Sequence, residues 1–203
     1  MKKRTMIITL VLLAILSCMP AFSATYYDNG SQRFTITAGV NFPISTTLFE
    51  DERTLVGHGF DFDKTKFTLL GGYGSLTYQM FVNPYFALGG EIGYGFNYYI
   101  DDALLTNVPM QFKVSFIPLQ GTIEIPLSLG AGFSYMSVSD GGAYMPFFLS
   151  FETGLDWYIT DNWGIGIKSG LWVIPELYFD SSKSYQNALQ TFIPLTLSVT
   201  YRQ

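Results

Sequence analysis

The chain has 203 residues and a formal net charge of −5; 13% of its residues are charged and 17% are aromatic. Soluble domains carry roughly 25% charged residues, so this composition disfavours an ordinary water-exposed surface. The length fits one domain, and the acidic balance argues against a nucleic-acid partner. Cys18 is the only cysteine, so we expect neither a disulfide framework nor a cysteine-ligated metal.

Residues 1–23 have the features of a secretory signal peptide. The basic residues 2–4 precede an apolar run over residues 6–16, and small residues precede a predicted cleavage site after Ser23. We therefore expect removal of residues 1–23 and a mature domain of residues 24–203.

Two alternatives for this segment remain open. A retained transmembrane helix is disfavoured, because the apolar run is shorter than the roughly 20 residues that a bilayer crossing needs and Pro20 follows it. A lipoprotein signal would make Cys18 a lipidation site, although Leu16 is large for the position it would occupy.

Residues 123–135 carry a pattern that recurs along the mature chain. Apolar residues take every second position, with Gly, Ser, Pro or Glu between them. Because successive side chains of a strand point to opposite faces, this run predicts a strand with one apolar and one small or polar face. It is longer than the roughly 9 to 11 residues with which a tilted strand crosses a bilayer. The pattern predicts strands near residues 31–42, 66–82, 85–100, 106–117, 121–136, 144–158, 163–174 and 191–201.

The connections between these strands alternate in length. Residues 83–84, 118–120 and 159–162 are short turns, whereas the other connections are mostly longer: 43–65 and 175–190 are long, 137–143 is intermediate and 101–105 is a short exception. Short periplasmic turns and longer extracellular loops are typical of outer-membrane barrels. The sequence therefore predicts an all-β fold, a single antiparallel up-and-down transmembrane β-barrel of about eight strands, in the outer membrane of a Gram-negative-type envelope.

Aromatic residues lie near both ends of the predicted strands, where a membrane barrel has its interfacial girdles. Those near the short turns are Tyr85, Phe86, Trp157, Tyr158, Trp163 and Tyr201, and those near the long loops are Tyr98, Tyr99, Tyr135 and Tyr144. A soluble lipocalin-like binding protein is the remaining alternative. Its polar face would need many Lys and Glu, where this chain has mainly Gly, Ser and Thr.

The mature chain resembles the small eight-stranded bacterial outer-membrane barrels of the OmpA, OmpX and OmpW type. Its most local likeness is the last strand, where Leu197, Val199 and Tyr201 alternate with polar residues and resemble the C-terminal signal of this family. The resemblance implies outer-membrane lipid, the barrel-assembly machinery and periplasmic chaperones as partners. The family usually ends on the aromatic residue itself, whereas Arg202 and Gln203 follow it here.

The predicted inward face carries charges that two assumed turn centres bring into pairs. A turn centred between residues 118 and 119 places Lys113 opposite Glu124, and one centred on residue 160 places Glu152 opposite Lys168. Nearby inward charges are Glu91, Asp156 and Arg33. Since an eight-stranded barrel is just wide enough for side chains to fill it, we interpret these charges as a salt-bridge plug. The alternative is a gate along a narrow conduit.

The sequence offers little for catalysis or for a cofactor. His58, the only histidine, lies in the long first loop, and no particular Ser or acid is tied to it. Asp61 and Asp63 lack the fuller ligand series of a calcium loop. We therefore expect no enzyme activity, no metal and no cofactor.

Two function hypotheses follow. The first is a barrel with a filled lumen that anchors surface loops for structural or adhesion roles, with an extracellular ligand at residues 43–65 and 175–190. The second is a narrow channel for small or hydrophobic molecules, as the OmpW resemblance implies. The lining of the upper lumen discriminates between them, and the predicted inward Phe67, Leu69 and Tyr99 favour the channel slightly.

Overall fold

The computed structural model describes residues 26–48, 54–56, 71–98, 104–139, 142–177 and 188–203. Several residues of interest lie outside these ranges: the predicted signal peptide of residues 1–23 with Cys18, and His58, Asp61, Asp63, Phe67, Leu69 and Tyr99.

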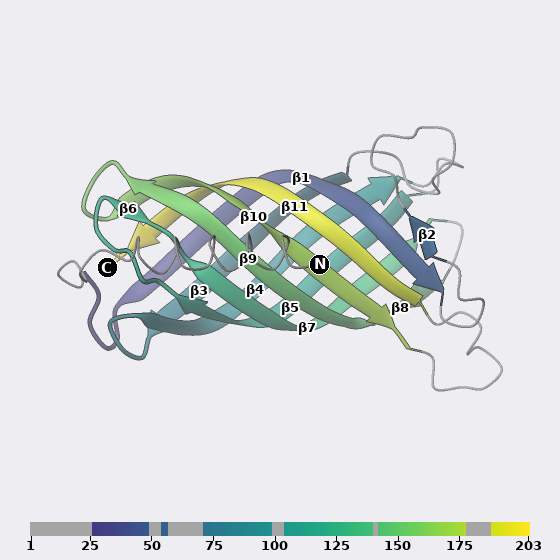
Figure 1. Ribbon diagram of the computed structural model, residues 1–203, viewed down its shortest axis with the longest axis horizontal. Helices are drawn as coiled ribbons and strands as arrows, with labels where there is room; N and C mark the ends of the chain where they lie inside the picture. Colours follow the sequence, from purple (N-terminus) through teal and green to yellow (C-terminus); the bar gives the residue numbers. More distant parts are fainter. Residues whose placement is uncertain (1–25, 49–53, 57–70, 99–103, 140–141, 178–187) are drawn as a thin grey trace, which may run out of the picture.

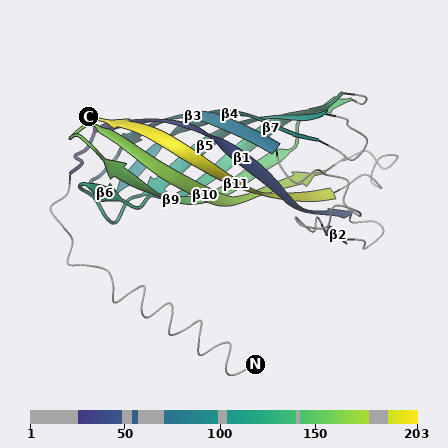
Figure 2. The ribbon, with the colours of Figure 1, turned by 90° about the horizontal axis from the view of Figure 1, so that it is seen from above.

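Eight long antiparallel strands close into a barrel in which the last strand pairs with the first (Figure 1, Figure 2). They are β1 (Gln32–Leu48), β3 (Gly71–Phe81), β4 (Phe86–Tyr98), β5 (Leu104–Phe116), β7 (Leu127–Val138), β9 (Phe147–Tyr158), β10 (Trp163–Glu176) and β11 (Ala188–Arg202). Three short strands are added to them: β2 (Thr54–Val56) pairs with β1, β6 (Ile123–Glu124) with β9, and β8 (Ala143–Tyr144) with β7. The predicted eight-stranded up-and-down barrel is confirmed.

The two ends of the barrel differ. At one end lie β6, the short connections 82–85, 117–122 and 159–162, and the C-terminus, whereas β2 and β8 lie at the other (Figure 1). Gln32 and Gln203 exchange two backbone hydrogen bonds at the first end, with N to O distances of 2.8 and 3.0 Å. Since short turns of such barrels face the periplasm, we name this the periplasmic end and the opposite one the loop end.

The outer face of the barrel is apolar. Large side chains project outward from every long strand, and Leu129 and Leu197 are 62% and 67% exposed. A water-facing sheet would carry charges at these positions, so the surface is that of a lipid-facing wall and not of a lipocalin-like barrel. In the described ranges we find no helix of the length and hydrophobicity that a membrane crossing requires.

Strand boundaries differ from the prediction mainly at the loop end. β1 continues to Leu48, β10 ends at Glu176 and β11 begins at Ala188, so parts of the predicted loops 43–65 and 175–190 are strand. The register of β1 against β11 shifts between Pro43 and Ser45. Pro43 has no N–H to give to the ladder, and a bulge lets the strand continue past it.

The predicted strand over residues 121–136 is wrong as one continuous element. It consists of β6 and β7, separated by Ile125 and Pro126. Pro126 cannot donate to a ladder, so its position interrupts the pairing with β9. The apolar alternation persists across the gap, because Ile123, Ile125 and Leu127 all remain exposed on the outer face.

The aromatic girdle at the periplasmic end is largely as predicted, with one correction. Phe86, Trp157 and Trp163 project outward and are 41%, 51% and 53% exposed. Tyr158 instead points into the barrel and is buried, because it has the same parity in β9 as the inward Asp156. At the loop end Tyr135 projects outward and is also exposed.

Candidate functional site

The lumen of the barrel is the candidate site, and inward glycines make room for its long side chains. A Cβ on Gly130 would lie 1.8 Å from Gln111 Oε1, and one on Gly166 would lie 2.2 Å from Asp156 Oδ1. The small residues of the inward face therefore create the space in which charged groups cross from one strand to another.

Lys113 of β5 is the centre of one buried charge cluster. Its Nζ lies 2.6 Å from Glu91 Oε2 and 2.5 Å from Glu152 Oε2. Glu91 also accepts hydrogen bonds from Thr77 Oγ1 at 2.6 Å and Gln111 Nε2 at 2.7 Å. Every oxygen of the Glu91 carboxylate thus has a donor, as a buried charge requires.

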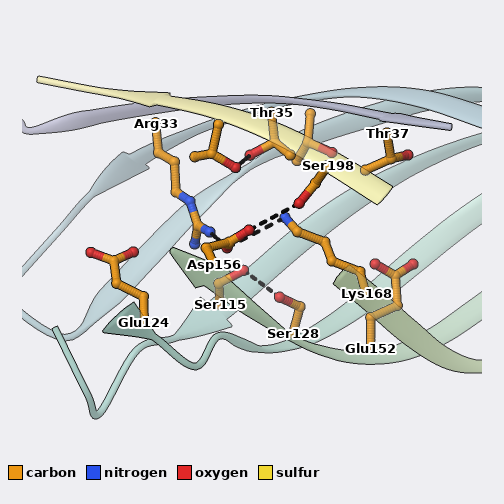
Figure 3. A network of polar contacts seen from close by, with 12 residues as sticks. Arg33, Thr35, Thr37, Ser115, Glu124, Ser128, Glu152, Asp156, Lys168 and Ser198 are labelled. Carbon is orange, nitrogen blue, oxygen red and sulfur yellow. Dashed lines mark hydrogen bonds and ion pairs between the residues drawn. The ribbon is translucent and has the colours of Figure 1, made fainter. Parts of the chain in front are cut away.

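Asp156 of β9 is the centre of a second cluster (Figure 3). It forms an ion pair with Arg33 of β1, accepts a hydrogen bond from Ser198 Oγ at 2.9 Å, and lies 3.8 Å from Lys168 Nζ. Both Arg33 and Asp156 are almost fully buried. Figure 3 shows these side chains converging across the lumen from strands on different sides of it.

Both predicted pairings of the inward charges are wrong in register. Lys113 lies opposite Gly130 and not Glu124, because the chain between β5 and β7 is a longer segment, residues 117–126, that contains the separate strand β6. Glu152 lies opposite Gly170 and Lys168 opposite Gly154, because the bond from Ile159 N to Trp163 O centres that turn on residue 161. The five predicted lumen residues Lys113, Glu124, Glu152, Lys168 and Glu91 do all point inward, but with other partners.

An apolar layer fills the lumen on the loop side of these charges. Trp172 lies at its centre, 4.4 Å from the Tyr73 ring and 5.2 Å from the Phe148 ring. The buried members are Tyr73, Leu105, Met136, Phe148, Trp172, Ile174 and Phe192. Trp172 Nε1 donates to Glu152 Oε1 at 3.3 Å, so the apolar layer joins directly onto the charge clusters.

A third layer closes the periplasmic end. Tyr27, Phe81, Ala87 and Ile117 form a buried apolar cluster there. Beside it Glu124 forms an ion pair with Arg202, and both side chains are buried. The lumen is thus filled at three levels along its axis.

Beside the charge clusters, the space left among the described residues is small. Two cavities of about 20 Å³ each lie beside the charge clusters, and both are bordered by Lys113, Glu152 and Lys168. A volume of this size holds about one water molecule. Arg33 borders one of them, and its Nε has no hydrogen-bond partner among the described residues.

The described residues contain no group of three or more His, Cys, Asp or Glu side chains arranged to hold a metal ion. Lumen hydroxyls are bonded to one another or to carboxylates and amides, such as Ser115 Oγ to Ser128 Oγ at 2.6 Å and Thr37 Oγ1 to Ser75 Oγ at 2.7 Å. The chemistry of this part of the site is pairing of charges and dipoles.

Sequence reasoning missed the apolar layers and Arg202. Trp172 and Phe148 have the same parity as Lys168 and Glu152 in their strands, so counting alternation would have placed them inside. Arg202 likewise has the parity of the inward Ser198 and Thr200. No local signal could have indicated that Tyr27, which precedes β1, enters the barrel.

Comparisons with known proteins agree with this architecture. A protein-family model matches residues 16–201. No curated protein matches the chain in sequence. Among solved structures, Neisserial surface protein A is 12% identical, with a TM-score of 0.54 over 85% of this chain and 97% of that one.

Two further structures are similar in outline only. The attachment invasion locus protein Ail of Yersinia pestis is 14% identical, with a TM-score of 0.48 over 86% of this chain and 99% of that one. OprG from Pseudomonas aeruginosa is 11% identical, with a TM-score of 0.46 over 87% and 98%. The fold of the Neisserial protein, the apolar outer wall and the closed sheet lead to one conclusion. The chain has the fold of the small eight-stranded bacterial outer-membrane β-barrels.

Proposed function

We propose that the protein is a membrane anchor with a filled lumen that holds its extracellular loops at the cell surface for a structural or adhesion role. The observation that carries this proposal is the packing of the lumen. Three layers of side chains occupy it, and the two cavities beside the charges measure only about 20 Å³ each.

An open conduit would require changes that are costly in this lumen. The charge layer would have to separate Lys113 from Glu91 and Arg33 from Asp156, all of them buried. Breaking a buried pair leaves an uncompensated charge, which costs about 3–5 kcal/mol. The apolar layer would also have to move Trp172 out of contact with Tyr73 and Phe148.

Single-channel recording in planar bilayers tests this proposal. Folding of the purified protein is first checked by the gel shift between heated and unheated samples. We expect no discrete openings, and the variant Trp172→Ala/Phe192→Ala, which truncates two of the seven buried members of the apolar layer, serves as the comparison. Regular openings of the unmodified protein would overturn the proposal.

One observation favours a second function, a narrow path for small hydrophobic molecules. At the loop end, the lumen is lined by apolar side chains, including Trp172, Phe148 and Phe192. Uptake of an apolar dye into liposomes that contain the protein distinguishes the two functions, even where the protein shows no openings in the planar bilayer. Dye uptake that becomes faster in Trp172→Ala would support the hydrophobic path. Uptake equal to that of protein-free liposomes would support the membrane anchor instead.

We further propose that residues 1–23 are a cleaved signal peptide and that Leu197, Val199 and Tyr201 are read by the barrel-assembly machinery. Leu197 and Val199 are exposed on the outer face of the last strand, which makes them accessible to another protein. Mass spectrometry of the protein from outer membranes tests the first point, with cleavage after Ser23 as the expected result. Crosslinking from position 197 during assembly tests the second.

The proposed ligand site comprises residues 43–65 and 175–190. Its test is binding of cells or of extracellular matrix to the protein in proteoliposomes, compared with a variant in which residues 57–64 are replaced by a short Gly-Ser linker. Equal binding by both proteins would exclude the first loop from the site.

A further inference from the structure

The chain segment that precedes β1 enters the periplasmic end of the barrel. Tyr27 is fully buried and stacks on Phe81, with 3.7 Å between ring centroids and 12° between ring planes. Its hydroxyl donates to the Glu124 carboxylate, at 2.8 and 3.0 Å from the two oxygens. Burial raises the pKa of Tyr27, so its phenol stays protonated and remains a donor.

A glutamine from a periplasmic turn holds the backbone of the same segment. Tyr26 N donates to Gln120 Oε1 at 2.9 Å, and Gln120 Nε2 donates to Pro84 O at 2.6 Å and to Ile117 O at 2.9 Å. The segment is therefore connected through Gln120 to the β3–β4 turn and to the turn that follows β5.

Arg202, near the C-terminus, meets the segment from the other side. Its guanidinium carbon lies 3.6 Å from the centroid of the Tyr26 ring and 3.5 Å from that of the Tyr158 ring. A guanidinium between two aromatic faces gains cation–π attraction on both sides. The same group forms the ion pair with Glu124 that was described above.

The Arg202 guanidinium also reaches two turns. Its Nε donates to Asp161 O at 2.9 Å and its NH1 group donates to Gly121 O at 3.0 Å. Tyr26 contacts the first of these turns as well, since its hydroxyl donates to Asp161 O at 2.8 Å. All three periplasmic turns are thus linked to the two ends of the described chain.

We infer that Tyr26, Tyr27, Glu124 and Arg202 form a terminal lock that secures the β1–β11 seam and seals the periplasmic mouth. The seam is the pairing that converts an open sheet into a closed barrel, and the lock joins the segment before β1 to Arg202, the last residue of β11. Arg202 reaches Tyr26 only when β11 lies beside β1, so the lock forms after closure and opposes reopening. Its role does not depend on whether the lumen conducts.

The lock gives Arg202 a role at the end of β11. This residue follows the outward Tyr201 and points inward, where it is buried. In this barrel Arg202 supplies the cation for the buried Glu124.

The test is the rate at which the protein reopens. Protein from outer membranes is unfolded in urea in detergent micelles, and loss of the gel-shifted barrel is followed over time. We expect Arg202→Gln to unfold at least about tenfold faster, since it leaves Glu124 buried without a cation. Gln203→Ala, next to it and exposed, is the matched control and should unfold at the rate of the unmodified protein.

A double-mutant cycle separates the lock from a general loss of packing. Tyr26 is 38% exposed, so Tyr26→Leu should fold, and we expect it to accelerate unfolding about threefold. In the Arg202→Gln background the same change should accelerate unfolding clearly less, because only the hydrogen bond of Tyr26 to Asp161 O is then left to lose. Additive effects, or unfolding of Arg202→Gln at the control rate, would overturn the inference.

Discussion

Asp156 is the only described carboxylate that lies within ion-pair distance of two cations, the buried Arg33 and the partly buried Lys168. It pairs with Arg33 of β1 and lies 3.8 Å from Lys168 of β10. Lys113 presents the opposite case, because one cation there has two carboxylates, Glu91 and Glu152. The loss of one carboxylate should therefore have unequal consequences in the two clusters.

We expect Asp156→Asn to lower the free energy of unfolding by about 3–5 kcal/mol, since it leaves Arg33 and Lys168 without an ion-pair partner among the described residues. Glu152→Gln should cost less than half of this, because Lys113 keeps Glu91. Urea titrations monitored by tryptophan fluorescence measure both values. Equal losses would show that the two clusters do not differ as described.

Gly166 lies where the Asp156 cluster is tightest. A methyl group at this position would lie 2.2 Å from Asp156 Oδ1, 2.6 Å from Leu155 O and 2.7 Å from Ser198 Oγ. Because one of these atoms belongs to the backbone, the clash cannot be relieved by a side-chain rotation alone.

We expect Gly166→Ala to cost about 1–3 kcal/mol, the usual range for overpacking a filled interior. Gly142→Ala is the control, since a Cβ there meets nothing within 4 Å. The midpoints of urea unfolding should separate the two variants clearly. Coincident midpoints would mean that the lumen tolerates added volume and is looser than its contacts indicate.

At the scale of strands, alternation alone located the elements well. The period of two and the turn residues predicted all eight long strands, most of them within a few residues of their bounds. Alternation of apolar and polar residues reflects only which face of the strand each residue takes, so it can be recognised in a single sequence. Tyr158 was wrongly assigned to the aromatic girdle because the prediction used its position near the end of β9 and ignored which face of the strand it takes.

Register was not predictable in the same way. It depends on where a turn is centred, and hydrogen bonds such as Ile159 N to Trp163 O decide that. In a tilted barrel long side chains also reach past the adjacent strand, as Lys113 of β5 does across β7 to Glu152 of β9. A sequence therefore indicates which charges are inside but not which of them pair.

The outward face of β11 provides a test of its lipid contact. Leu197 lies in the middle of the strand, opposite Ala38 and Ile167, and is 67% exposed. Ile159 is similarly exposed at 62% but lies in a periplasmic turn. The two positions differ in their expected depth in the bilayer and not in their exposure.

We expect Leu197→Arg to lower stability in lipid vesicles by about 2–4 kcal/mol, the cost of a cation near the bilayer midplane. Ile159→Arg should cost about 0–1 kcal/mol, as at an interface. Equilibrium unfolding from vesicles measures both. Similar values would place position 197 at the interface and would contradict the assumed tilt and depth of the barrel.

On the scale of the whole molecule, the three tryptophans report on its two environments. Trp157 and Trp163 are 51% and 53% exposed on the outer wall near the periplasmic end, whereas Trp172 is fully buried in the lumen. An open aqueous conduit and a filled lumen make opposite predictions for Trp172, because only water in the lumen would bring a soluble quencher to it.

A variant with Trp157→Phe and Trp163→Phe leaves Trp172 as the only tryptophan. We expect its fluorescence in vesicles to be blue-shifted and to resist both iodide in the buffer and brominated acyl chains in the bilayer. The reason is that Tyr73, Phe148 and the charge layer separate this indole from water and from lipid alike. The converse variant, Trp172→Phe, retains the two outer tryptophans and should be quenched strongly by brominated lipid. Strong iodide quenching of Trp172 would mean that water reaches the apolar layer, and the filled lumen would have to be abandoned in favour of a conduit.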